Sequence, residues 1–218
     1  MIINHKYKFI FIHVPKCGGT SIKRALYPYC DKWDQFLGGH PSVPDDNGEG
    51  MHKHSGAMEI KSYATPQRWE EYFTFAFVRN PLARTLSLYN WWLRVDGEFE
   101  PEKKELIRKL SFKEFVFSDY TGRPQVEFLI SKPKKDTFVA NKNRIELDLI
   151  GKQETLRKDF AYFCGLNKIP NLELGRHNET SRKHDRRNPD FVRDAYDDES
   201  RREVKRRFAE DFDAFDYC

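Results

Sequence analysis

The stretch FIFIHVPKCGGTSIKRAL, Phe9 to Leu26, joins an apolar run to a loop of small and polar residues. Residues 9–14 are apolar at nearly every position, which is typical of a central strand covered by helices on both faces. Beyond the loop, Ile22, Ala25 and Leu26 follow helical spacing. The predicted order is therefore strand, loop, helix.

The loop itself has the residue types of an anion site. Backbone N–H groups in a loop of small residues can point at an anion, and the start of the following helix adds partial positive charge. A lysine adds a point charge, and hydroxyl groups add donors. The residues predicted to bind an anion are Lys16, Cys17, Gly18, Gly19, Thr20 and Ser21. The alternative is a tight turn whose glycines only relieve backbone strain.

The order of residues in this loop argues against the usual nucleoside-triphosphate loop. In the pattern G-x-x-x-x-G-K-[ST] the lysine follows the glycines, whereas Lys16 precedes Gly18 and Gly19. The order therefore disfavours a kinase or an ATPase.

A second strand, loop and helix follow further along the chain. Residues 73–78 (FTFAFV) form an apolar run, Asn80 and Pro81 interrupt it, and residues 82–95 have a helical apolar face. Other predicted elements are a helix over 65–72, helices over 111–119 and 125–130, a strand over 145–150, a helix over 156–164, and a helix capped by Ser200 with Glu203. This alternation predicts an α/β fold with a central, mostly parallel sheet flanked by helices. Ligands bind outside the carboxyl ends of such strands.

Composition sets broad limits on the class of protein. The 218 residues suit a single domain, residues 1–218, and 38 Lys plus Arg against 34 Asp plus Glu give +4, which indicates no nucleic-acid partner. Four separated cysteines show no metal-ligand spacing, so no metal is predicted. No apolar run reaches the length of a membrane span. The cysteine pattern and the lack of a cleavable leader predict a cytoplasmic location.

Two motifs resemble those of a known family. PKCGGTS, from Pro15, is similar to the 5′-phosphosulfate loop of sulfotransferases that use 3′-phosphoadenosine 5′-phosphosulfate (PAPS), and FAFVRNPLARTLSLY, Phe75 to Tyr89, is similar to their 3′-phosphate motif. The resemblance implies a three-layer, P-loop-like fold and PAPS as co-substrate, without a metal. It also implies that Lys16 stabilises the bridging oxygen of the leaving group.

The chemistry of the second motif agrees with that resemblance. Arg79 can place two guanidinium donors on phosphate oxygens, and Ser87 can add a hydroxyl from the helix. The alternative is an ordinary surface arginine and a helix serine. For Arg84, a phosphate contact and a structural ion pair are both open.

The segment MHKHSGA, Met51 to Ala57, offers a general base. If it is extended, His52 and His54 project to the same side, and a neutral imidazole can take a hydroxyl proton near pH 7. The pair resembles that of the branch of the family that sulfates uronic acids in glycosaminoglycans, a heparan 2-O-sulfotransferase-like branch, which implies His54 as the base and His52 as its partner. Two solvent-exposed histidines are the alternative, and a zinc pair lacks a third ligand.

The chain departs from the cytosolic small-molecule sulfotransferases, because it lacks their C-terminal Arg-Lys-Gly segment. Residues 176–183 (RHNETSRK) are the nearest stand-in, with Arg176 assigned to the 3′-phosphate or to an anionic acceptor; a solvated loop explains them equally well. Trp91 and Trp92 could form a sugar-stacking wall or pack in the core. Residues 31–50 are expected to form a long surface loop.

Three functions are weighed. The leading one is a PAPS-dependent sulfotransferase acting on a hydroxyl acceptor, most plausibly a saccharide. The second is a nucleoside-triphosphate-dependent phosphotransferase, in which Asp148 would hold magnesium. The third is a non-catalytic binder of anionic polysaccharides, in which the two histidines are incidental.

Overall fold

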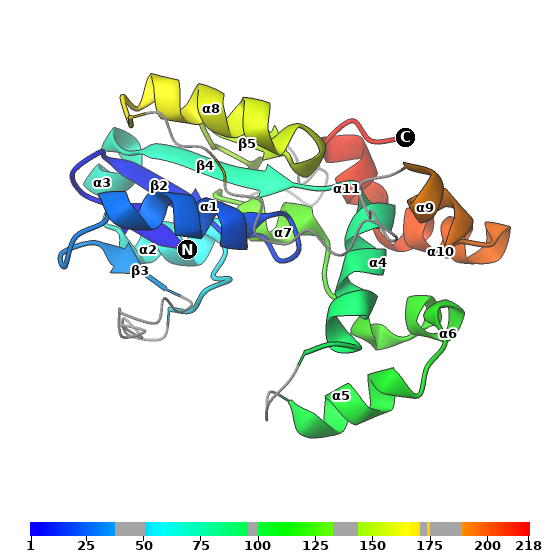
Figure 1. The fold of residues 1–218 in the computed structure, drawn as a ribbon. Coiled ribbons are helices and arrows are strands. Elements are labelled where there is room, and N and C mark those ends of the chain that lie inside the picture. The colour runs from blue at the N-terminus through cyan, green and yellow to red at the C-terminus, as the bar shows by residue number, and fades with distance from the viewer. Residues whose placement is uncertain (38–50, 96–99, 133–143, 171–173, 175–188) are drawn as a thin grey trace. The chain divides into compact units, whose positions relative to one another are not determined.

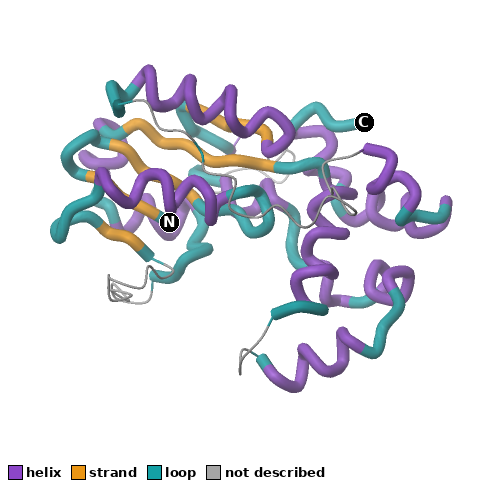
Figure 2. The backbone as a smooth tube through the Cα atoms, in the orientation of Figure 1, coloured by secondary structure: helices purple, strands orange, loops and turns teal. Residues whose placement is uncertain are grey.

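The computed structural model describes residues 1–37, 51–95, 100–132, 144–170, 174 and 189–218 (Figures 1 and 2). Two compact units are distinguished in the chain. Unit 1 comprises residues 1–78 and 125–178, and unit 2 comprises residues 79–124 and 179–218. The single domain that the sequence predicted over residues 1–218 stays a prediction.

Unit 1 contains a five-stranded sheet flanked by helices. Its strands are β1 (Ile2–Asn4), β2 (Phe9–Ile12), β3 (Gln35–Phe36), β4 (Phe73–Val78) and β5 (Leu149–Lys152), in the order β3-β1-β2-β4-β5. The pairs β2–β4 and β4–β5 are parallel, as the two strand-loop-helix motifs predicted. The pairs β1–β2 and β1–β3 are antiparallel.

The sheet is therefore mixed, and the prediction of a mostly parallel sheet is wrong in this respect. Only residues 5–8 connect β1 to β2, and a connection of that length can join only antiparallel neighbours. Because β1 is three residues long, it carries too few positions to show an alternating pattern in the sequence.

The last strand also begins later than predicted, at Leu149 rather than Ile145. Ahead of it, Asp148 takes part in side-chain hydrogen bonds: its Oδ2 accepts from the Thr74 backbone N–H (2.6 Å) and hydroxyl (2.9 Å). The backbone N–H of Asp148 in turn donates to the carbonyl of Thr74 (3.0 Å). These bonds hold the segment next to β4 before the regular ladder begins.

Five helices of unit 1 are described, and the sequence predicted four of them closely. They are α1 (Gly19–Leu26), α2 (Ala57–Tyr63), α3 (Pro66–Glu71), α7 (Gln125–Leu129) and α8 (Leu156–Leu166). Helix α8 lies along β4 and β5 (Figure 1), with the ring of Phe163 stacked on Phe75 at 3.8 Å between centroids. Phenylalanines at alternate positions of β2 and β4, among them Phe9 and Phe11, complete this buried aromatic layer.

Every regular element described in unit 2 is a helix (Figure 2). The longer helices are α4 (Pro81–Trp92), α5 (Pro101–Arg108), α6 (Phe112–Phe117), α9 (Pro189–Asp194), α10 (Asp198–Arg207) and α11 (Ala209–Ala214). One core cluster includes Leu82, Leu86, Val204 and Phe208, and thus ties α4 to the C-terminal helices.

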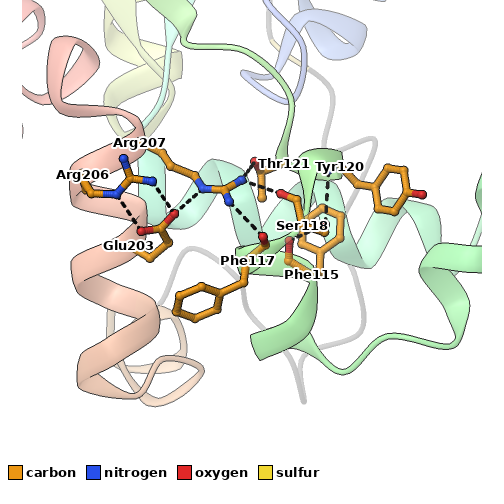
Figure 3. Close-up of polar contacts among 8 residues, drawn as sticks. All are labelled: Phe115, Phe117, Ser118, Tyr120, Thr121, Glu203, Arg206 and Arg207. Atoms are coloured by element: carbon orange, nitrogen blue, oxygen red, sulfur yellow. Dashed lines mark hydrogen bonds and ion pairs between the residues drawn. The ribbon is translucent and has the colours of Figure 1, made fainter.

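The cap of α10 differs from the prediction. Asp197, not Ser200, precedes the helix, and its Oδ1 accepts from the Ser200 N–H at 2.7 Å. Ser200 lies inside the helix, and Glu203 bonds instead to Arg206 and Arg207 (Figure 3). An aspartate and a serine are comparably good caps, so local sequence did not distinguish the two positions.

Candidate functional site

The loop after β2 has the backbone conformation of an anion-binding concavity. Lys16 and Gly18 both have positive φ angles, +67° and +85°, and α1 begins immediately afterwards at Gly19. When residues of right-handed and left-handed backbone conformation alternate, their successive N–H groups point to one side of the loop. No side chain caps α1, and its first turn contains no acidic residue. This start of a helix is therefore suited to a negatively charged ligand.

Gly19 allows a close approach that no other residue would permit. A Cβ atom on Gly19 would lie 2.1 Å from Cδ2 and 2.2 Å from Nε2 of His13, well inside van der Waals contact. The imidazole of His13 therefore packs directly against the first residue of α1, and only 3% of His13 is exposed. His13 was not among the residues predicted to form the site. Its signal was a histidine at the end of an otherwise apolar run, directly before the loop.

Cys17 supports the loop from inside. Its Sγ is buried and lies within hydrogen-bond distance of two acceptors for its single proton, Oε1 of Gln125 (3.1 Å) and the carbonyl of Pro15 (3.4 Å). The side chain thus points into unit 1, toward Gln125 of α7, and the anion-binding role of Cys17 stays a prediction. Thr20 is exposed and Ser21 is half-buried, so both hydroxyls lie near the surface.

The two predicted histidines lie in a turn, so the expectation of an extended segment is wrong. The Ser55 N–H donates to the carbonyl of His52 (3.0 Å), and the His52 N–H donates to the Ser55 hydroxyl (3.0 Å). A hydrogen bond between the two residues therefore sets the position of the His52 ring relative to His54, and not the alternation of side chains along a strand. In that bond the backbone N–H of His54 donates to Nδ1 of His52 (3.1 Å).

The ring of His54 is held by the backbone carbonyl of His13, the residue directly after β2. Its Nδ1 lies 2.7 Å from the carbonyl oxygen of His13, and the two imidazole centroids are 4.6 Å apart in an edge-on arrangement. A carbonyl oxygen can only accept, so Nδ1 of His54 carries the proton in the neutral ring. The lone pair is then on Nε2. His54 can take a proton through that nitrogen.

The imidazoles of His54 and His13 are both neutral near pH 7. Burial lowers the pKa of His54 to about 4, against the opposing effect of its hydrogen bond to His13. Burial likewise lowers the pKa of His13 well below its ordinary value, with further lowering from nearby positive charges, including Lys53. Neutral rings of this kind can act as proton acceptors or as N–H donors.

The two predicted phosphate ligands of the second motif, Arg79 and Ser87, lie in unit 2. Asn80 caps α4, because its Oδ1 accepts from the N–H groups of Leu82 (2.9 Å) and Ala83 (3.4 Å), and Pro81 occupies the first helical position. Arg79 directly precedes the cap and is 7% exposed. Ser87 is half-buried on α4. The phosphate roles of Arg79 and Ser87 stay predictions.

Arg84 has a structural environment inside unit 2. Its Nη2 donates to the carbonyl of Arg123 (3.1 Å), and its guanidinium lies 5.9 Å from the ring centroid of Phe208. The side chain is buried. The phosphate contact and the structural ion pair that the sequence left open for Arg84 both stay predictions.

Asp148 does not lie where a magnesium ligand is needed. It precedes β5 and bonds to Thr74, near the amino end of β4, whereas the loop follows the carboxyl end of β2. Because β2, β4 and β5 are parallel, Asp148 and the loop lie at opposite ends of these strands. Among the described residues, no cluster of three or more His, Cys, Asp or Glu side chains is arranged to hold a metal ion.

The aromatic and C-terminal candidates have different outcomes. Trp92 is buried with Ile107 and Phe115, and Trp91 packs against the same cluster, so both contribute to the core of unit 2. Arg176, with the rest of residues 176–183, lies outside the described residues, as do residues 38–50 of the predicted loop.

Comparison with known proteins identifies relatives of this chain. A sequence model described as "Sulfotransferase family" matches residues 1–218. Carbohydrate sulfotransferase 10 of Danio rerio is 26% identical over 97% of this chain and 64% of its own length, and the Xenopus laevis protein of that name is 25% identical over 100% and 67%. Carbohydrate sulfotransferase 14 of Danio rerio is 26% identical over 74% and 46%.

The chain thus spans about two thirds of the first two relatives and less than half of the third. No solved structure matches it significantly. None of the helices in the described part of the chain combines the length and the apolar character that crossing a lipid bilayer requires.

Proposed function

Because the chain belongs to the sulfotransferase family, we propose that it transfers the sulfuryl group of PAPS to a hydroxyl of a carbohydrate. Membership of the family supports sulfuryl transfer and PAPS as the donor. The names of the relatives, carbohydrate sulfotransferases, support a saccharide acceptor. A P-loop-like, three-layer arrangement is part of the proposal. It is supported by the parallel strands β2, β4 and β5, with the loop at the carboxyl end of β2.

The proposed reaction is a single in-line displacement. The acceptor oxygen attacks sulfur, its new S–O bond forms as the bond from sulfur to the bridging oxygen breaks, and Nε2 of His54 receives the hydroxyl proton. Adenosine 3′,5′-bisphosphate leaves with the bridging oxygen and the electron pair. Lys16 and the N–H groups at the start of α1 stabilise the charge that develops there.

The co-substrate is divided between two sets of residues in this proposal. The 5′-phosphosulfate belongs to the loop from Lys16 to Ser21, and the 3′-phosphate belongs to Arg79 and Ser87, with Arg176 as a further candidate. Lys16 supplies a movable point charge, while the arginine can donate two bonds to one phosphate.

One observation carries the proposal: the 2.7 Å hydrogen bond from Nδ1 of His54 to the carbonyl of His13. It attaches an imidazole to the residue that leads into the anion loop, and it leaves the basic nitrogen of that imidazole without its proton. This orientation is the one that a general base acting through Nε2 needs.

Binding and transfer measurements test the proposal. We expect adenosine 3′,5′-bisphosphate to bind without magnesium in calorimetry, and labelled PAPS to sulfate at least one member of a saccharide panel. Lys16→Ala should abolish transfer, whereas Lys6→Ala, an exposed lysine beyond β1, should leave it unchanged. Magnesium-dependent ATP binding would support the phosphotransferase instead, and nucleotide-free polysaccharide binding would support the non-catalytic binder.

The cytoplasmic location is carried forward as a proposal that rests on the sequence alone. The four cysteines are free thiols in the structure, which suits a reducing compartment without requiring one. Microscopy of the tagged chain tests it.

A further inference from the structure

We infer that His13 is a further ligand-binding residue of this site: its Nε2–H donates to a non-bridging oxygen of the anionic 5′ group held at the start of α1. The inference rests on the proposed function for the identity of that group. It adds a residue that neither the predicted loop nor the predicted base includes.

The first observation is an unsatisfied polar atom in a buried ring. His13 is 3% exposed, and its Nδ1 has no hydrogen-bond partner among the residues that the structure describes. Buried polar groups nearly always have partners, and a buried N–H group without one is the costlier case, so an unpaired Nδ1 indicates a nitrogen without a proton. Unpaired buried N–H groups are rarer than unpaired acceptors, so the proton of the neutral ring belongs on Nε2.

The second observation is where Nε2 lies. Cδ2 and Nε2 of the ring lie 2.1 and 2.2 Å from the position that a Cβ atom on Gly19 would take, and Cε1 lies 2.9 Å from it, so the ring packs on Gly19 with its Nε2 side. Gly19 is the first residue of α1, whose first turn has no capping side chain. The buried donor is thus placed beside the backbone N–H groups that favour an anion. A glycine at this position makes that approach possible.

The ring is also held rigidly before any ligand arrives. It stacks on Phe11 with centroids 5.7 Å apart and planes 22° apart, and it meets the ring of His54 edge-on at 4.6 Å. A donor that is already oriented loses little freedom on binding, so its hydrogen bond contributes more to affinity. Burial lowers the pKa of His13 well below its ordinary value, so the ring is neutral and does not oppose proton uptake by His54.

Substitutions that separate the two ring nitrogens test the inference. His13→Phe keeps the ring's volume and removes both nitrogens. The side-chain nitrogen of Gln occupies about the place of Nε2, and that of Asn about the place of Nδ1. We expect His13→Phe and His13→Asn to weaken nucleotide binding by about tenfold or more, as for loss of a hydrogen bond to a charged group. His13→Gln should recover much of the affinity.

The matched control is His5→Phe. His5 lies between β1 and β2, and its Nδ1 pairs with the Tyr72 hydroxyl (2.8 Å). Loss of the His5 ring nitrogens should therefore leave nucleotide binding unchanged. Calorimetry with adenosine 3′,5′-bisphosphate and with PAPS gives two comparisons. A loss confined to PAPS assigns the bond to a sulfuryl oxygen, and a loss with both nucleotides assigns it to the 5′-phosphate.

The outcomes distinguish this inference from the proposed function. If the unaltered protein binds neither nucleotide, the proposed function fails. If the protein binds but His13→Phe binds equally well, the role of His13 is overturned and the proposed function stands. Nitrogen-15 NMR of the unaltered protein gives an answer even if the variants do not fold. A proton on Nε2 of His13 that shifts on adding nucleotide supports the inference, and a proton on Nδ1 overturns it.

Discussion

The backbone N–H of His54 donates to Nδ1 of His52 at 3.1 Å, while Nδ1 of His54 donates to the carbonyl of His13. The two histidines of this turn therefore carry their ring protons on opposite nitrogens when neutral. His52 uses Nδ1 as an acceptor and keeps its proton on Nε2, whereas His54 has the lone pair on Nε2. Residues that look equivalent in the sequence are thus chemically different in the structure.

This difference predicts unequal effects of substitution. His54→Asn should keep the donor at the place of Nδ1, and with it the bond to His13, but it removes the base. We expect turnover to fall by about 10²- to 10⁴-fold with the nucleotide dissociation constant nearly unchanged. His52→Asn retains an acceptor for the His54 N–H and should have a smaller effect. Steady-state kinetics and calorimetry measure both, and normal turnover in His54→Asn would exclude His54 as the base.

The lowered pKa of His54 predicts how stability depends on pH. Its pKa is about 4 when folded, below the ordinary value of 6.5, so the unfolded chain binds more protons between these values. The contribution of His54 is therefore fully present above pH 6.5 and lost as pH falls toward 4, with an upper limit of about 3 kcal/mol. Urea unfolding between pH 7 and 5 measures the slope, because most carboxyl groups stay ionised there.

The control for that slope is His54→Asn, which cannot titrate. Its stability should change less between pH 7 and pH 5 than that of the unaltered protein. His13 shifts in the same direction and remains in the variant, so part of the slope should persist. Equal slopes in the two proteins would show that His54 is not held neutral by burial.

Much of the local structure was predictable because it depends on neighbouring residues. The run 73–78 is β4 over its full length, and the Thr65–Pro66 pair starts α3, with the Thr65 hydroxyl accepting from Arg68. The residue types of the anion loop could be recognised for the same reason. Their chemistry follows from a lysine, glycines and hydroxyl groups that are adjacent in the chain.

What could not be predicted depends on residues that are distant in sequence. The orientation of His54 is set by a carbonyl 41 residues earlier, and the position of His13 by its approach to Gly19. Cys17 looked like a loop residue, but its thiol bonds to Gln125, 108 residues later. No periodicity or propensity reports contacts of this kind, because they arise only when segments distant in the sequence pack together.

Gly19→Ala should disturb the loop through His13. The new Cβ would overlap the imidazole of His13, which packing against Phe11 prevents from moving freely. We expect a loss of about 1–3 kcal/mol in unfolding free energy, together with weaker nucleotide binding. Gly165→Ala is the matched control, since nothing lies within 4 Å of its Cβ position in α8 and alanine favours helix.

A double variant, His13→Ala with Gly19→Ala, tests whether the loss in Gly19→Ala comes from overlap with the His13 ring. Removing the ring removes the overlap, so the double variant should be more stable than the sum of the two single losses predicts. Unfolding free energies of the four proteins give the coupling. Additive losses would mean that Gly19 is needed for its own backbone freedom and not for the approach of His13.

Arg206 and Arg207 bond to the same carboxylate, Glu203, yet they should contribute very differently to stability (Figure 3). The side chain of Arg206 is 71% exposed, while that of Arg207 is 22% exposed and also reaches the segment after α6. There Nη2 donates to the carbonyl of Phe117 (2.9 Å), and Nη1 donates to the carbonyl of Ser118 and the hydroxyl of Thr121. Arg207 thus joins α10 to α6.

We therefore expect Arg207→Ala to lower the unfolding free energy by about 2–4 kcal/mol, because it leaves Glu203 and two carbonyl groups with fewer donors. Arg206→Ala should change the unfolding free energy little, as is usual for an exposed ion pair. Arg207→Lys should recover little, since an ammonium group cannot reach the four acceptors of Arg207, which are placed for a planar guanidinium. Denaturant unfolding of the three variants measures these losses, and similar losses for both arginines would contradict the assigned difference.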